Sequence, residues 1–176
     1  MKVRDWYFQG WERREDAKGR AAFVYTGEYY SFPAKLKRPK LTAALYTAAV
    51  AACYCLAAFS RADGAMWRIA AVPQLLDLIP LIYLVLGAVC LIAAKQPMTF
   101  RAWYTSWRRL RSAALWCAVL AAGMAAVQLV YIVMNGAYTP LEFGYLAASL
   151  ASGLSAYLLR RRMTANPCDQ TGGSSD

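Results

Sequence analysis

The first residue that could do chemistry is Asp77, the one acidic residue inside a long apolar stretch of the sequence. An acid at the centre of a membrane-spanning helix costs about 2.5–3.5 kcal/mol on insertion scales, and such residues are functional candidates by default. A structural interpretation competes with this one. If the helix enters the membrane near Leu75, Pro73 lies in its first turn and Asp77 faces the positive end of the helix dipole at the outer boundary. The sequence favours the boundary interpretation.

Three further polar residues lie near the outer ends of the predicted helices. Arg68 precedes the second apolar segment, Gln128 lies close to the outer end of the third, and Glu142 begins the fourth. Our functional hypothesis is that these three side chains and Asp77 converge on an outward-facing polar pocket. Such a pocket would suit a small cation or a polar solute.

The sequence lacks most of the residues and motifs that other kinds of chemistry require. The chain has no histidine, which excludes a Ser-His-Asp triad and every histidine metal site. Its five cysteines form neither a Cys-x-x-Cys pair nor a zinc spacing, so we expect them to fill apolar space (Cys53, Cys55, Cys90, Cys117 and Cys168). Glycine-rich phosphate loops and nucleophile motifs are missing. We therefore expect no catalytic residue, no metal and no cofactor.

Four apolar segments must position these residues. They cover residues 41–59, 69–94, 113–134 and 141–159, in a chain of 176 residues that is 59% hydrophobic and 17% charged. About 20 helical residues cross a hydrocarbon core of about 30 Å, so each segment is long enough to span. The fold class that we predict is an all-α integral membrane protein with four transmembrane helices between residues 41 and 159.

Positive charge predicts the orientation of these helices. Of the 20 lysines and arginines, 18 lie in residues 1–40, 95–112 and 160–162. Because cytoplasmic loops carry the excess of basic residues, both termini are expected in the cytoplasm of a cell-membrane protein. The net charge of +10 is then explained by the orientation of the helices in the membrane, and we expect no nucleic-acid partner.

The basic inner surface also predicts contact with anionic lipid headgroups. Thr99 is placed to cap a helix that begins at Phe100, with an aromatic face that suits the membrane interface. The residues expected to contact headgroups are Arg101, Trp103, Trp107, Arg108, Arg109, Arg111, Arg160, Arg161 and Arg162.

The ends of the chain are expected to be small cytoplasmic segments. Residues 1–40 contain β-branched and aromatic residues around Thr26 and Gly27, a pattern that predicts a β-hairpin over residues 22–32. Residues 160–176 are polar, and we expect them to form a frayed tail.

Residues 42–52 and 112–122 are identical at six of eleven aligned positions. Either they are an internal repeat, which would give two hairpins of the same orientation, or two alanine-rich helices match by chance. Small residues spaced four apart predict close helix packing, or a dimer interface on one stripe. The residues assigned to packing are Ala48, Ala118, Ala122, Gly144, Ala148 and Ser152.

For function, the sequence favours a non-catalytic interaction subunit or scaffold that works with a protein partner or as a homo-oligomer. The alternative is a small oligomeric transporter or channel with an outer-leaflet pocket around Asp77.

Overall fold

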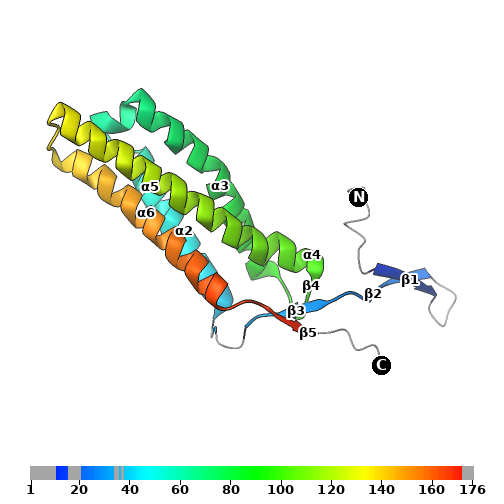
Figure 1. The fold of residues 1–176 in the computed structure, drawn as a ribbon. Coiled ribbons are helices and arrows are strands. Elements are labelled where there is room, and N and C mark those ends of the chain that lie inside the picture. Colours follow the sequence, from blue (N-terminus) through cyan, green and yellow to red (C-terminus); the bar gives the residue numbers. More distant parts are fainter. Residues whose placement is uncertain (1–10, 16–20, 34–35, 37, 172–176) are drawn as a thin grey trace.

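The computed structural model describes residues 11–15, 21–33, 36 and 38–171. Four long helices lie side by side and form a bundle (Figure 1). They are α2 (Pro39–Ala58), α3 (Arg68–Ala93), α5 (Arg109–Asn135) and α6 (Pro140–Ala165). Helix α5 continues without a break from α4 (Phe100–Trp103) through the π-helical turn η2 (Tyr104–Arg108).

Short strands lie at one end of the bundle. Strand β3 (Tyr29–Ser31) pairs antiparallel with β4 (Met98–Thr99) on one side and with β5 (Asp169–Thr171) on the other. We call this end the sheet end. The opposite end, with the 3-10 turn η1 (Asp63–Met66) and the turn before α6, is the loop end. Strands β1 (Trp11–Glu15) and β2 (Ala21–Tyr25) form a separate antiparallel pair.

The strand pairing differs from the predicted hairpin over residues 22–32. Residues 22–25 pair with β1, while Tyr29–Ser31 pair with strands that come from far along the chain. The predicted tail also differs, because α6 continues through the three arginines to Ala165 and β5 then joins the sheet. The sheet could not be predicted locally, because strands far along the chain, β4 and β5, supply the partners of β3.

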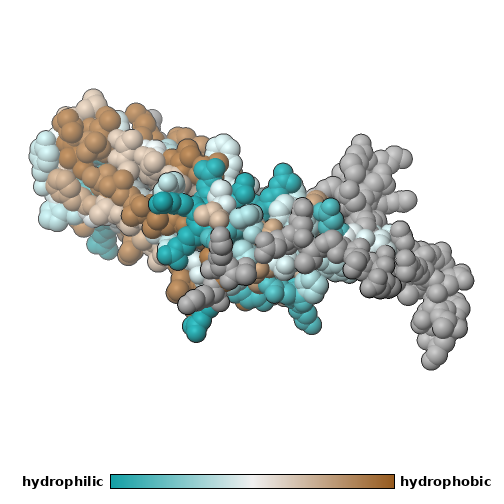
Figure 2. Space-filling model, turned by 60° about the horizontal axis from the view of Figure 1, so that its bottom comes forward, coloured by the Kyte–Doolittle hydropathy of each residue, from teal (hydrophilic) through white to brown (hydrophobic). Residues whose placement is uncertain are grey.

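Among the described residues, three helices are long and apolar enough to cross a membrane: Pro39–Ala58, Ile69–Ala93 and Phe100–Asn135. Large apolar side chains point outward along them, and Figure 2 shows these side chains gathered over the bundle, away from the hydrophilic sheet end. The protein is therefore built as a helical membrane protein. Helix α6 has a similar length but many small and polar residues.

Local sequence explains the sharp turn between α5 and α6. Gly136 ends α5 in the left-handed conformation, with φ of 61°, which glycine adopts without a steric penalty. Thr139 then caps α6 by accepting a hydrogen bond from the backbone N–H of Glu142, and Pro140 occupies the first helical turn. This turn places Glu142 opposite Gln128, seven residues before the end of α5.

The residues assigned to packing differ in burial. Ser152 is buried and Ala118 and Ala148 are half-buried, whereas Ala48, Ala122 and Gly144 are exposed in the single chain. The helices approach closely at Gly87, against the Leu110 backbone, and at Gly153, against the α5 backbone near Ala118 and Ala122.

Candidate functional site

Three layers of polar side chains lie inside the bundle. The first layer is at the loop end, where Gln128 and Glu142 are almost completely buried, with 0% and 2% of their surfaces exposed. The Glu142 carboxylate accepts a hydrogen bond from the Gly64 backbone N–H over 3.1 Å and a second one from the Gln128 side-chain amide. These bonds join η1, α5 and α6 at one point.

Gly64 is required in this layer by its surroundings. A Cβ atom on Gly64 would lie 2.6 Å from Gln128 Oε1, 2.7 Å from Glu142 Oε2 and 2.7 Å from a ring carbon of Tyr131. The ring of Tyr131 in turn lies 5.5 Å from that of Trp67. The 3-10 turn therefore covers the buried carboxylate like a plug, and no side chain fits at position 64.

The second layer lies deeper and centres on Gln74 of α3. The Tyr54 hydroxyl of α2 donates a hydrogen bond to the Gln74 backbone carbonyl over 2.9 Å. The Tyr145 hydroxyl of α6 donates to the Gln74 side-chain oxygen over 3.4 Å. Tyr145 is fully buried, so this layer belongs to the interior of the bundle.

Asp77 forms the third layer, one helical turn beyond Gln74. Its side chain is 0% exposed, and neither carboxylate oxygen has a hydrogen-bond partner among the described residues. The Cys117 thiol of α5 faces the Asp77 carboxylate as a weak donor, and Tyr54 of α2 also interacts with it electrostatically. Asp77 is therefore a buried acid whose one neighbouring donor among the described residues is a thiol.

The start of α3 differs from the one that the boundary interpretation assumed. Helix α3 begins at Arg68, no acidic residue lies in its first turn, and Pro73 and Pro80 are both inside it. Asp77 lies about 12 Å along the helix from Ile69, the first residue of the candidate span, at about 1.5 Å per residue. Its side chain is buried and faces the other helices of the bundle.

The predicted outer pocket is formed only in part. Gln128 and Glu142 meet, but Asp77 hydrogen-bonds to neither and lies deeper in the bundle. The side chain of Arg68 lies outside the described residues. Gly64, Gln74, Tyr54 and Tyr145 were missed, because a tyrosine or a glycine in an apolar helix carries no signal of its own until its partner is known.

The residues predicted to contact lipid headgroups divide into arginines, which are exposed or half-buried, and tryptophans, which pack against other rings of the protein. Arg101, Arg108, Arg111, Arg161 and Arg162 are exposed, and Arg109 and Arg160 are half-buried. Trp107 is only 3% exposed and packs near Phe32, so the structure contradicts its assignment to headgroup contact. Trp103 stacks on Tyr30, with ring centroids 4.7 Å apart, and this stacking attaches the sheet to the bundle.

The predicted Thr99 cap is confirmed, because the Thr99 hydroxyl oxygen accepts a hydrogen bond from the Ala102 backbone N–H.

No family model, curated protein or solved structure matches the chain. The function proposed below therefore rests on the geometry of the described residues.

Proposed function

We propose that this protein is a small membrane transport protein that binds a proton at Asp77, takes it up from the loop side of the membrane and releases it to the other side. One observation carries the proposal: Asp77 is completely buried in the interior of a membrane-type helical bundle, and among the described residues no hydrogen bond holds either of its oxygens. An ionised carboxylate in that position is strongly disfavoured, and a bound proton neutralises it.

The polar layers support a route for the proton from the loop end. The Glu142 and Gln128 pair comes first, the Tyr145, Gln74 and Tyr54 group follows, and Asp77 lies one turn further along α3. Acidic side chains are usual members of intramembrane proton relays. The hydroxyls of Tyr54 and Tyr145 can each donate and accept a hydrogen bond. The plug formed by η1 over Glu142 would have to open for exchange.

A proton suits the site better than a metal ion. Metal cations such as Ca²⁺ and Mg²⁺ take about six or more oxygen ligands. Among the described residues, no group of three histidine, cysteine, aspartate or glutamate side chains gathers in one place. A single carboxylate is enough to carry a proton.

The proposal includes four spans, with α6 as the fourth helix and both termini in the cytoplasm of a cell-membrane protein. Helix α6 packs along α2 and α5 inside the same bundle, which supports its spanning role. The basic residues at the sheet end support a cytoplasmic location for that end.

Proton uptake into liposomes tests the function. We expect vesicles that contain the protein, an internal pH dye and an imposed membrane potential to take up protons faster than empty vesicles. Asp77→Asn should lower the rate to that of empty vesicles, because the amide cannot bind the proton. Glu28→Gln is the matched control, since Glu28 is an exposed acid at the sheet end, away from the polar layers, and its amide oxygen can still accept from the Tyr30 hydroxyl; this variant should keep the wild-type rate.

The proposal fails if wild-type protein moves no protons or if Asp77→Asn moves them normally. A non-catalytic interaction subunit is then the function that remains. The observation in its favour is the T-shaped contact between Tyr25 of β2 and Tyr29 of the sheet, with ring centroids 5.1 Å apart, which continues a T-shaped contact of Tyr25 with Trp11 of β1 at 5.4 Å. This contact presents paired strands beside the membrane, where a protein partner or a second copy would find them.

A further inference from the structure

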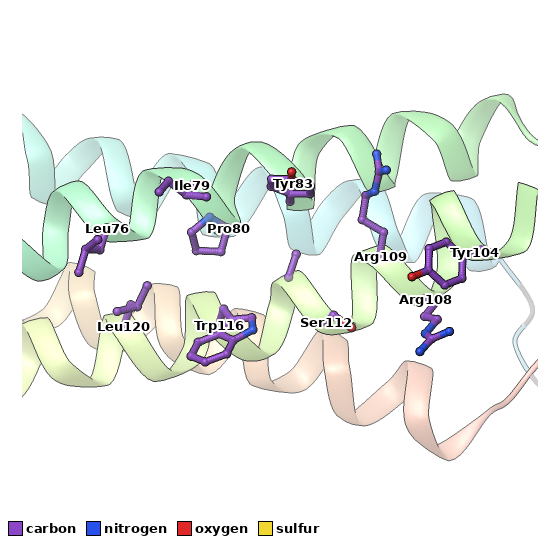
Figure 3. Close-up of a pocket in the computed structure, with 11 residues that line it drawn as sticks. Leu76, Ile79, Pro80, Tyr83, Tyr104, Arg108, Arg109, Ser112, Trp116 and Leu120 are labelled. Carbon is purple, nitrogen blue, oxygen red and sulfur yellow. The ribbon is translucent and has the colours of Figure 1, made fainter. Parts of the chain in front are cut away.

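A groove between α3 and α5 opens on the outer surface of the bundle (Figure 3). Its volume is about 750 Å³, which falls in the range of about 300–1,000 Å³ that is typical of ligand pockets. Asp77 does not line the groove, because it faces the interior of the bundle. A ligand in the groove would therefore not contact the proposed proton-binding residue.

The two halves of the groove differ in chemistry. The half toward the middle of the bundle is apolar and is lined by Leu76, Ile79, Pro80, Trp116 and Leu120. The half toward the sheet end contains the polar lining residues (Tyr83, Tyr104, Arg108, Arg109 and Ser112). Figure 3 shows this order along the two helices. A ligand that fits must be an amphiphile with its polar group at the sheet end.

The length of the groove matches one leaflet of a bilayer. Arg108 and Leu120 are twelve residues apart along one helix, which is about 18 Å. Half of a hydrocarbon core of about 30 Å is about 15 Å. A ligand headgroup at the arginines therefore places its hydrocarbon chain along the groove as far as the middle of the membrane.

Aromatic rings position the two guanidinium groups. The Arg108 guanidinium carbon lies 4.7 Å from the centre of the Tyr104 ring, and that of Arg109 lies 5.5 Å from the centre of the Tyr83 ring. The sequence has no acidic residue between Asp77 and Glu142, and within the described part of the chain neither arginine forms an ion pair. Their N–H donors are free for an anion, and arginine matches the geometry of phosphate.

We infer that the groove is a specific site for one anionic phospholipid from the leaflet at the sheet end. Arg109 holds the phosphate from the α3 side of the groove, and Arg108 adds positive charge at the same end from the other side of the helix. Ser112 lines the same end, and one acyl chain runs over Pro80 toward Leu120. The positive charge selects an anionic headgroup over a zwitterionic one.

Lipid titration of the purified protein tests the site. Native mass spectrometry should show one phosphatidylglycerol retained per chain, with phosphatidylcholine retained more weakly. The double variant Arg108→Gln/Arg109→Gln should weaken phosphatidylglycerol binding about tenfold or more. The control Arg111→Gln/Arg161→Gln removes the same charge from exposed arginines outside the groove lining and should bind as the wild type does.

A second pair of variants tests the shape of the groove without changing charge. Ser112→Phe fills the headgroup end and should also weaken binding, whereas Ala122→Phe adds the same side chain to an exposed position of α5 that does not line the groove. The inference is overturned if the two double variants lose affinity equally, if phosphatidylcholine binds as well as phosphatidylglycerol, or if Ser112→Phe binds lipid normally. Far-ultraviolet circular dichroism confirms that each variant is folded.

Discussion

At the scale of single residues, the buried polar groups are of two kinds. Glu142 accepts hydrogen bonds from Gly64 and Gln128, so its carboxyl group holds three elements together. Neither oxygen of Asp77 has a close hydrogen-bond partner among the described residues, so its carboxyl group does not contribute to the fold in the same way. This difference is why we give Glu142 a structural role beside its place in the proposed route and assign the proton-binding role to Asp77.

Substitution of Gln128 tests the structural role of this pair. Gln128→Met keeps the length of the side chain but leaves one oxygen of the buried Glu142 carboxylate without its donor. Loss of a partner for a buried group costs about 1–3 kcal/mol, so we expect a clear fall in the thermal unfolding temperature in detergent. Leu129→Met is the control, because Leu129 is exposed on the same helix. Equal stability of the two variants would contradict the role of this bond.

At the scale of the elements, glycine decides how closely α3 and α5 approach. A Cβ atom on Gly87 would lie only 3.1 Å and 3.2 Å from the N and Cα atoms of Leu110, and the backbone of a packed helix cannot move away easily. Lys40 stabilises the same region at the sheet end by donating from its ammonium group to the carbonyls of Ile92 and Ala94, each over 2.7 Å. These carbonyls at the end of α3 would otherwise lack a partner.

Two glycine-to-alanine substitutions should therefore have opposite signs. Gly123 has open space where a Cβ atom would lie, so Gly123→Ala should raise the unfolding free energy by about 0.5–1 kcal/mol through helix propensity. Gly87→Ala gains the same propensity but forces α3 away from Leu110, and we expect a net loss of stability. Thermal unfolding of both variants in one detergent measures the difference, and an equal rise in both would show that the close approach is unimportant.

At the scale of the whole molecule, the sheet joins three distant segments at one end of the bundle. Strand β3 lies between β4 and β5. Tyr30 of β3 and Met98 of β4 are both buried. Both ends of the described chain therefore lie at the sheet end (Figure 1). If α6 spans the membrane, the turn at Asn135 and the residue Cys168 must lie on opposite sides.

Cysteine labelling in intact cells tests this topology. One variant keeps Cys168 and the buried Cys117, with the other three cysteines replaced by alanine. A second replaces Cys168 by serine as well and carries Asn135→Cys. A membrane-impermeant maleimide should label the second variant from outside, and the first only after the cells are opened. Labelling of both variants in intact cells would show that α6 does not cross.

Much of the architecture was determined by the sequence alone. The apolar lengths predicted four spans, of which the structure confirms three as candidate spans, and Thr99 predicted the start of α4. These features depend on sums along the chain, such as hydropathy over about 20 residues, or on a contact within one turn.

Only the tertiary structure decided which face of each helix points inward and at what height the helices meet. The apolar segments carry no polar stripe, so rotation and axial register cannot be derived from one helix at a time. For this reason the burial of Asp77, the meeting of Gln74 with Tyr54 and Tyr145, and the close approach at Gly87 became visible only with all the helices in place.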